Sequence, residues 1–179
     1  MSKRILEFGK GVLGIFLFFA IQIGFQIVFY DIFVQKNFLV NNILLLIMEF
    51  VLMGILILMN RKKLKNDYAD FNENHKNYLK YGFKLWFIGL IVMMISNGII
   101  AGMTGGLASN EEANRQLMLQ YPIYMVISTM MLAPFIEELT FRGNFKEAFK
   151  SKKVFILFTD FVFASVHVLN GITNPLELL

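Results

Sequence analysis

Three ionisable side chains lie close together in an otherwise apolar stretch of this 179-residue sequence. Glu137, Glu138 and Arg142 fall within residues 133–143, and His167 follows in the next apolar stretch. Ionisable groups are costly in hydrocarbon, so in a membrane-spanning helix they mark a functional site that faces the protein interior. Two carboxylates and an imidazole are sufficient for acid–base chemistry on a water molecule. These four residues are therefore the candidate catalytic residues.

The spacing within this stretch places the two carboxylates on different sides of a helix. Glu138 and Arg142 are four residues apart, so on a helix they share a face and can pair. Glu137 is rotated from Glu138 by about 100° around the helix axis. Two adjacent carboxyl groups do not both ionise in a low dielectric without a nearby cation. We therefore expect Arg142 to neutralise one carboxylate and to leave the other as a general base or acid near neutral pH.

An antiparallel hairpin would bring Glu137 and His167 to the same depth. If the hairpin turn is centred near Lys152, both residues lie 15 positions from the turn. At a rise of roughly 1.5 Å per residue, they become level about 20 Å from it. This arrangement requires the helix that carries Glu137 to continue through Phe145 and Phe149.

The following apolar stretch predicts a matching helix face. Asp160, Phe163 and His167 occur at positions i, i+3 and i+7 and therefore share one side of a helix. We expect this side to meet Glu137 and Glu138. A histidine in a membrane helix can also serve only as a hydrogen-bond partner for a neighbouring helix. Asp160 can either orient His167 or pair with a lysine near the inner surface.

Two other residues in apolar stretches leave more than one interpretation open. Pro134 removes an amide donor three residues before Glu137, which predicts a kink. A kink in a membrane helix either lies beside a polar cavity or is purely structural. Glu49 has no obvious partner in the sequence, and we treat it as a helix-packing or protonated residue.

The composition excludes several classes of protein. Apolar residues make up 56% of the chain, and the mean hydropathy of +0.58 is too high for a soluble protein of this size. The sequence contains no cysteine, which excludes disulfides, thiolate metal sites and a cysteine nucleophile. It also lacks the H-E-x-x-H pattern of zinc peptidases and the G-x-S-x-G pattern of serine hydrolases.

Hydropathy predicts an all-α, polytopic membrane helix bundle that forms a single integral membrane domain over residues 1–179. Each apolar run approaches the roughly 20 residues needed to cross a hydrocarbon layer of about 30 Å. The five predicted spans are residues 11–29, 43–59, 85–102, 123–142 and 154–169, and the last two form a hairpin over residues 123–170.

The basic residues predict the orientation of the spans. With a cytoplasmic N-terminus, the outer connections hold only Lys36 and Arg115 of the 17 lysines and arginines. The other lysines and arginines all lie in the inner segments, and such an excess of basic residues marks the cytoplasmic side. We therefore expect a multi-pass protein of the cell membrane. The basic residues lie between apolar runs, so they suit contact with the lipid bilayer and not with nucleic acid.

The connections between the predicted spans carry signals of their own. Residues 61–84 place aromatic side chains at helical spacing among charges, which suits either an interfacial amphipathic helix or a solvated loop. Residues 104–120 are polar and contain glycines, which predicts an exposed loop or a short surface helix. Pro122 occupies a favoured position for the first turn of a helix.

The residues around the candidate site resemble a known family. The pattern A-P-x-x-E-E-x-x-F-R-G over residues 133–143 and the pattern F-x-x-x-H that ends at His167 are similar to the CPBP family of intramembrane proteases. That family includes CAAX prenyl endopeptidases and bacteriocin-processing or bacteriocin-immunity proteins. The resemblance runs from Ala133 to Asn170, and the first three spans match only in character.

The resemblance implies an intramembrane endopeptidase that cleaves a peptide near the inner leaflet. It implies that Glu137 is the catalytic base, that Glu138 and Arg142 support it, and that His167 binds or activates the attacking water. The activation is either by glutamate alone or by Zn²⁺ or another divalent metal, with Glu137 and His167 as metal ligands. The implied substrate is a peptide or protein, either prenylated or a bacteriocin precursor.

The family pattern also has a third motif on a later helix, in which a histidine is followed four residues later by asparagine or a similar residue. No histidine follows His167 in this sequence, so we expect a truncated or degenerate member. One alternative function is a non-catalytic membrane protein of the same fold that gives self-immunity against a bacteriocin. Another is an ion or proton carrier that uses Glu49, Glu137 and Asp160.

Overall fold

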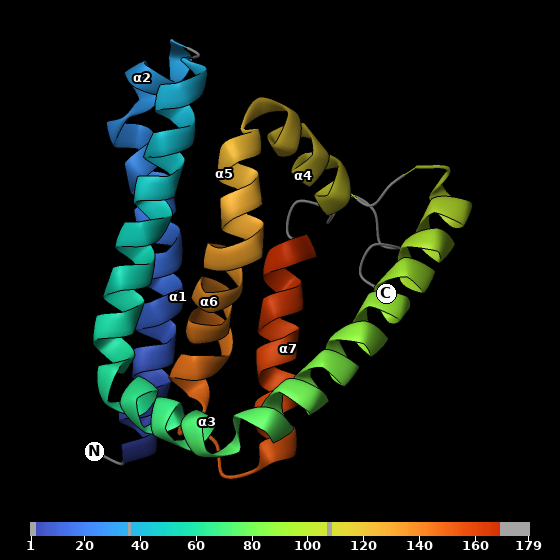
Figure 1. Cartoon of the computed structure of the whole chain (residues 1–179). Coiled ribbons are helices and arrows are strands. Elements are labelled where there is room, and N and C mark those ends of the chain that lie inside the picture. The colour runs from blue at the N-terminus through green and yellow to red at the C-terminus, as the bar shows by residue number, and fades with distance from the viewer. Residues whose placement is uncertain (1–2, 36, 107–108, 169–179) are drawn as a thin grey trace. The chain divides into compact units, whose positions relative to one another are not determined.

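The computed structural model describes residues 3–35, 37–106 and 109–168, with the backbone alone at 104, 109, 110, 167 and 168. All of its elements in these ranges are helical, which confirms the all-α prediction (Figure 1). The elements are α1 (Lys3–Val28), α2 (Tyr30–Val34), α3 (Phe38–Thr104), α4 (Ser109–Gln120), α5 (Pro122–Ile127), η1 (Ser128–Leu132), α6 (Ala133–Glu137), η2 (Glu138–Arg142), η3 (Gly143–Phe145) and α7 (Lys152–Val168).

Within the part of the chain that the structure describes, three helical stretches are long and apolar enough to cross a membrane. They are Lys3–Val28, Phe38–Met103 and Pro122–Phe145, and the last of these is the continuous run from α5 to η3. Helix α7 is also apolar but has 17 residues, at the short end for a span. The structure therefore supports integration into a membrane, and the number of five spans stays a prediction.

Helix α3 joins two of the predicted spans. It is 67 residues long, a contour of roughly 100 Å at the usual rise, which is far more than one bilayer crossing requires. Residues 61–84 are helical within it, so the helical alternative for this connection is confirmed. The short helix α4 likewise confirms the helical alternative for residues 104–120, and Pro122 opens α5 as predicted.

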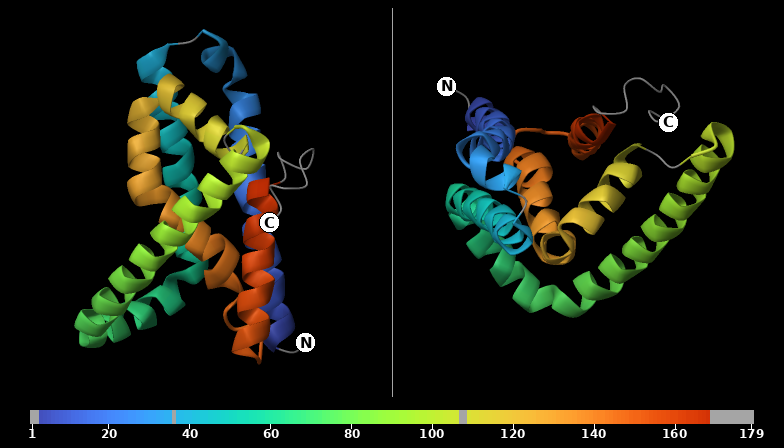
Figure 2. Two further views of the ribbon diagram at one scale, coloured as in Figure 1. Left: turned by 90° about the vertical axis from the view of Figure 1, so that its right-hand side faces the viewer. Right: turned by 90° about the horizontal axis from the view of Figure 1, so that it is seen from above.

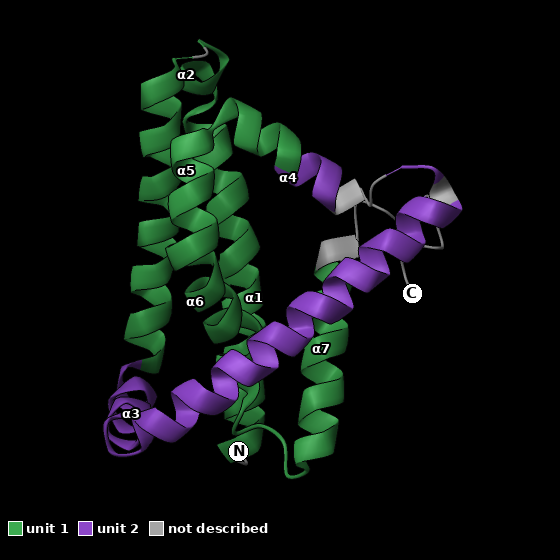
Figure 3. Ribbon diagram, turned by 45° about the vertical axis from the view of Figure 1, so that its right-hand side comes forward, with its two compact units in different colours: residues 1–60, 115–166 green, residues 61–114, 167–179 purple. Residues whose placement is uncertain are grey.

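The chain divides into two compact units, which Figure 3 colours separately. Unit 1 comprises Met1–Asn60 and Arg115–Val166, and unit 2 comprises Arg61–Asn114 and His167–Leu179. The prediction of a single membrane domain is not tested by this division. Glu137, Glu138 and Arg142 belong to unit 1.

The core of unit 1 is formed where α3 packs against the run from η1 to α6. Leu52 and Leu56, one turn apart on α3, pack with Leu132 and Ile136, which have the same spacing on the other run. Each of these four side chains is buried. Phe18 of α1 packs against this cluster. The i, i+4 spacing explains the contact, because it places both side chains of a helix on one face.

Helix α1 approaches the end of the η2–η3 segment very closely, and the two elements lie side by side in Figures 1 and 2. Gly11 and Gly14 are the buried residues of α1. A Cβ at Gly11 would overlap the ring of Phe145, and a Cβ at Gly14 would overlap the side-chain amide of Asn144. Small residues allow this approach between membrane helices.

Aromatic side chains join α1, η3 and α7 near the connection after Phe145. The Phe8 ring lies 5.6 Å from the Phe145 ring and 5.8 Å from the Phe158 ring. Phe149 lies 5.0 Å from Phe158. Lys3 adds an ion pair with Glu147 at 2.9 Å. These contacts hold the connection against the first turns of α1.

The helical run that carries Glu137 ends earlier than predicted. It stops at Phe145 and is followed by a turn, so the expectation that it continues through Phe149 is wrong. Gly143 and Asn144 near the end explain the early stop, because glycine and asparagine are weak helix formers. Three pairs of aromatic rings nevertheless join the two sides of the hairpin, and in each pair the midpoint of the two residue numbers is close to 152, as the hairpin prediction requires. The pairs are Phe141–Phe163, Phe145–Phe158 and Phe149–Phe155.

Within unit 2, the polar part of α3 is held by contacts along its own surface. The Tyr78 hydroxyl donates a hydrogen bond to Asp70 at 2.6 Å, and this bond raises the pKa of Tyr78. The Phe71 ring stacks on the Tyr78 ring at 6.3 Å. Farther along, the Asn97 amide donates to Glu111 at 3.1 Å and ties α3 to α4.

Candidate functional site

The candidate site lies on a helical run that is wound differently from its neighbours. The segments η1 and η2 are π-helical, and α6 is the single α-helical turn between them. Pro134 stands in the first turn of α6, where its missing amide donor interrupts the regular hydrogen-bond pattern. Short π-helical turns occur frequently at functional sites. The second of them begins at Glu138 and ends at Arg142.

Arg142 links the motif to α7 through two carboxylates. It donates hydrogen bonds to Glu138 Oε2 and to Asp160 Oδ1, each at 3.1 Å. The pairing with Glu138 confirms the prediction from the four-residue spacing. The partner of Asp160 is Arg142 and not the lysine that was considered from the sequence. All three side chains are about half exposed, with Arg142 at 46%.

The Phe163 ring completes the environment of this arginine. The guanidinium carbon of Arg142 lies 5.9 Å from the centre of the ring, within reach of a cation–π interaction. Phe163 also packs edge-on against Phe141 at 5.6 Å. The predicted face of α7 that carries Asp160 and Phe163 therefore does meet the segment that carries Glu138.

A cavity opens beside Glu137, the other carboxylate of the motif. It has a volume of about 260 Å³ and lies within unit 1. Its wall is formed by Pro134, Glu137, Glu138, Phe141, Arg142 and Phe163. Since one water occupies roughly 30 Å³ of liquid, the cavity can hold several waters or a peptide group with a water. This finding supports the polar-cavity alternative for the predicted kink at Pro134.

The two adjacent glutamates have different surroundings. Glu138 is exposed and bound to Arg142, whereas Glu137 is half-buried on the cavity wall. The helical rotation between neighbouring residues explains this difference. Arg142 thus offsets the charge of Glu138 and Asp160 and borders the space in which Glu137 lies.

The structure gives Glu49 partners that the sequence did not reveal. The Tyr124 hydroxyl and the Ser128 hydroxyl donate to its Oε1 atom at 2.8 and 2.7 Å. The residue is only 8% exposed. Tyr124 and Ser128 are one helical turn apart in the fourth apolar stretch, and this spacing is the signal that could have identified a polar face opposite Glu49.

A buried amide pair ties α3 to the end of the motif. The Asn60 side chain donates to Asn144 Oδ1 at 2.7 Å, across 84 residues of sequence. Both asparagines are buried, as is Thr140, one turn before Asn144. Buried polar atoms that lack a partner are costly, so this contact favours one arrangement of the two helices. No sequence spacing connects residues so far apart, and sequence reasoning missed the pair.

The remaining candidate residue, His167, is in the last turn of α7. Its side chain, and the predicted contact with Glu137, lie outside the described residues. Among the residues whose side chains are described, no group of three histidine, cysteine, aspartate or glutamate side chains could hold a metal ion. A catalytic zinc typically has three protein ligands. Glu138 and Asp160 are engaged by Arg142, so the described residues alone do not fit a zinc site.

Comparison with known proteins bears on the same segment. Residues 119–179 match the model of a family described as type II CAAX prenyl endopeptidase Rce1-like. The match covers Glu137, Glu138, Arg142 and His167, and leaves out the first three predicted spans. Searches among curated proteins and among solved structures gave no match. Over residues 119–179 the chain is therefore similar to the Rce1-like type II CAAX prenyl endopeptidases, which is consistent with a protein of the CPBP family.

Proposed function

We propose that this protein is an intramembrane endopeptidase of the CPBP type in the cell membrane, with Glu137 as the general base. The observation that supports this most directly is the position of Glu137 on the wall of a 260 Å³ cavity. The cavity lies in the segment that matches an endopeptidase family. Membrane helices rarely hold carboxylates without a functional reason.

The proposed reaction uses a water in this cavity. The Glu137 carboxylate takes a proton from the water as its oxygen attacks the scissile peptide carbonyl. The protonated Glu137 then gives this proton to the leaving amine nitrogen. Negative charge that develops on the carbonyl oxygen needs a donor, and His167 is the proposed one. The hairpin register centred near residue 152 supports this role, because it is the register from which His167 was expected beside Glu137.

Arg142, Glu138 and Asp160 are proposed to position the catalytic base. The two ion pairs of Arg142 join η2 to α7, so they fix the two walls of the cavity relative to each other. The proposed reaction uses Glu137, His167 and a water.

The proposed substrate is a peptide whose scissile bond reaches this cavity near the inner leaflet. Prenylated proteins and bacteriocin precursors are the two substrate classes that the family resemblance suggests. A lipid-modified or apolar peptide could enter from the bilayer, since much of the apolar surface of this chain is exposed.

The test is to measure peptide cleavage by Glu137→Gln and His167→Ala in proteoliposomes. We expect each change to lower the rate by about a hundred-fold or more, because removal of a general acid–base group typically costs 10²–10⁴-fold. Glu73→Gln is the matched control, because Glu73 is an exposed carboxylate on α3 in unit 2. Full cleavage by both folded variants would contradict the proposal, and protection against a bacteriocin by the same variants would favour the immunity function.

A further inference from the structure

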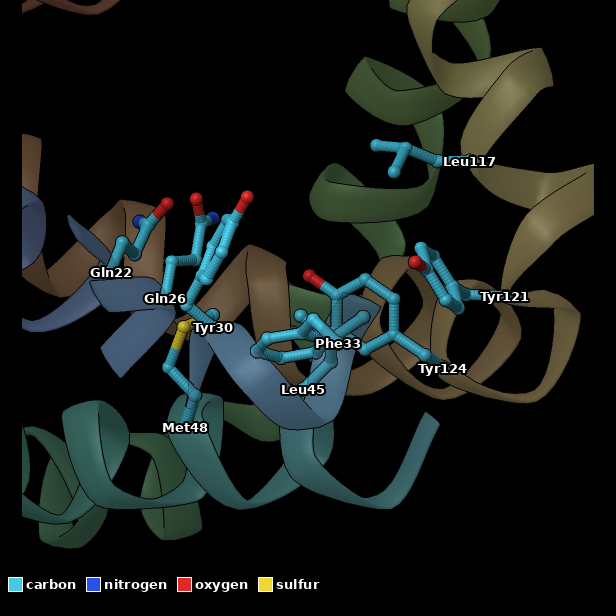
Figure 4. Close-up of a pocket in the computed structure, with 9 residues that line it drawn as sticks. All are labelled: Gln22, Gln26, Tyr30, Phe33, Leu45, Met48, Leu117, Tyr121 and Tyr124. Atoms are coloured by element: carbon cyan, nitrogen blue, oxygen red, sulfur yellow. The ribbon is translucent and has the colours of Figure 1, made fainter. Parts of the chain in front are cut away.

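A second cavity lies in unit 1, beside the start of the helical run that carries the carboxylate motif. It has a volume of about 400 Å³ and is formed by the ends of α1, α2, α3 and α5 and by Leu117 of α4 (Figure 4). Its polar side chains are two glutamines and three tyrosines, and the rest of its wall is apolar. None of the described residues that line it is acidic or basic. The polar residues are Gln22, Gln26, Tyr30, Tyr121 and Tyr124.

Tyr124 connects this cavity to a buried carboxylate. Its hydroxyl donates to Glu49 Oε1 at 2.8 Å, and its ring lines the cavity. In Figure 4 the Tyr124 hydroxyl points from α5 towards the side of the cavity that holds Gln26 and Tyr30. Because its proton is committed to Glu49, the hydroxyl oxygen can act only as an acceptor towards a ligand. The hydrogen bond that it donates to Glu49 polarises the hydroxyl and strengthens its oxygen as an acceptor.

Glu49 itself is short of partners. Both of its hydrogen bonds go to Oε1, from Tyr124 and Ser128, and Oε2 accepts none from the described residues. The residue is more than nine-tenths buried. A carboxylate in such a place is costly unless a cation or further donors offset it. A positive charge in the cavity, next to the Tyr124 hydroxyl that contacts Glu49, would offset part of that cost.

The other walls of the cavity suit a cation with an apolar body. The rings of Tyr30, Phe33, Tyr121 and Tyr124 line this space (Figure 4). Aromatic faces attract ammonium groups, and several rings around one space are the usual way of binding them. The side-chain oxygens of Gln22 and Gln26 add neutral acceptors. A phosphate or carboxylate would meet the field of Glu49 and find no basic side chain.

From these contacts we infer that this cavity is a binding site for an organic ammonium group, held by the Tyr124 oxygen in front of Glu49 and by the surrounding aromatic rings. The distribution of basic residues predicts that this end of α1 faces outward. Two sources could present an ammonium group there, the headgroup of phosphatidylethanolamine and the amine of a peptide.

The first experiment measures binding of phenethylammonium to the full chain in phosphatidylcholine nanodiscs, by saturation-transfer NMR. The neutral 2-phenylethanol, which has the same ring and a hydroxyl in place of the ammonium, is the matched ligand. We expect phenethylammonium to bind at least about ten-fold more tightly, as befits a hydrogen bond to a charged group. Equal affinity for the two ligands would overturn the inference.

Variants locate the binding to this cavity. Glu49→Gln keeps an oxygen that can accept from Tyr124 and Ser128 but removes the charge, and we expect it to abolish the ten-fold preference. Gln26→Leu, on the far wall, tests the same cavity without touching the buried carboxyl and should weaken binding several-fold. Glu73→Gln, an exposed carboxylate of unit 2, should bind as the unaltered protein does. A preference that survives both Glu49→Gln and Gln26→Leu would contradict the assignment.

A second set of nanodiscs separates the two sources. If the ligand is the lipid headgroup, native mass spectrometry should show phosphatidylethanolamine retained over phosphatidylcholine, and Glu49→Gln should remove this selectivity. If the ligand is a peptide amine, the lipids should be retained equally while phenethylammonium still binds. Either result supports an ammonium site. The inference would be overturned if the protein neither retained phosphatidylethanolamine over phosphatidylcholine nor bound phenethylammonium.

Discussion

Arg142 is the residue on which the geometry of the candidate site depends. It forms hydrogen bonds with one carboxylate on its own segment and one on α7, each at 3.1 Å. A planar guanidinium can bridge two carboxylates in this way because its donors point in fixed, diverging directions. A lysine would present a single point of charge and lose this geometry. The site therefore depends on an arginine and not only on a positive charge.

The first prediction at this scale concerns Arg142→Lys. Exposed ion pairs are worth about 0.2–1 kcal/mol each, so the free energy of unfolding should fall by no more than about 1–2 kcal/mol. Peptide cleavage should fall much further, by about ten-fold or more in kcat, because small misplacements of a catalytic group are costly. Unfolding curves and cleavage kinetics in the same membrane preparation measure both effects.

Lys150→Arg is the matched control for this exchange, since Lys150 is exposed and lies outside the cavity. Lys150→Arg should leave both the free energy of unfolding and the kcat of peptide cleavage unchanged. A loss of stability in Arg142→Lys with undiminished kcat would assign Arg142 a purely structural role.

Residue spacing predicted part of this site and could not predict the rest. The pairing of Glu138 with Arg142 followed from a helical interval, and the face of Asp160 and Phe163 followed from the i, i+3 pattern. The partner of Asp160 depends on where two helices meet, which spacing within one helix does not determine. The contact between Asn60 and Asn144 spans 84 residues and left no local signal.

At the scale of elements, the close approach of α1 to η3 positions the end of the motif. Gly14 lies against the Asn144 amide, and Asn144 is in turn held by Asn60. The helical run was predicted to continue to Phe149, but it ends at Phe145, directly after this contact. Hydropathy could not predict that end, because residues 146–149 include apolar and basic side chains that are equally compatible with a helix.

Gly14→Ala tests this packing. A methyl group at this position would overlap the Asn144 amide, and a shift of this amide would disturb its hydrogen bond with Asn60. Overpacking costs about 1–3 kcal/mol, and the better helix propensity of alanine returns up to about 1 kcal/mol. We expect a net loss of about 1–2 kcal/mol in the free energy of unfolding, measured by denaturant titration in detergent.

Gly24→Ala on the same helix is the control, because no described atom lies within 4 Å of a Cβ at that position. It should be neutral or slightly stabilising. Equal effects of the two substitutions would show that α1 does not pack against Asn144 in the membrane.

At the scale of the whole molecule, the predictions of membrane integration and of orientation depend on composition and on the distribution of charge. The apolar fraction of 56% predicted membrane integration, and the apolar helices agree with it. The orientation depends on a separate signal, the collection of nearly all lysines and arginines in alternate connections. That signal acts during insertion, through the attraction of basic segments to the cytoplasmic side, so the folded chain does not contain it as a contact.

The predicted orientation has consequences for both cavities. With a cytoplasmic N-terminus, the connection after α1 faces outward and residues 61–84 face the cytoplasm. The carboxylate cavity would then open towards the inner leaflet and the aromatic cavity towards the outer one. The two proposed sites would therefore draw their ligands from opposite sides of the membrane.

Single cysteines test this orientation cleanly, because the natural sequence contains none. Gln35→Cys, at the end of α2, should react with a membrane-impermeant maleimide added to intact cells. Lys76→Cys, in the polar part of α3, should react only after the membrane is permeabilised. The same labelling from one side at both positions would mean that the chain between them does not cross the bilayer. The assignment of the two cavities to opposite leaflets would then fall, while the local geometry around Glu137 and Glu49 would stand.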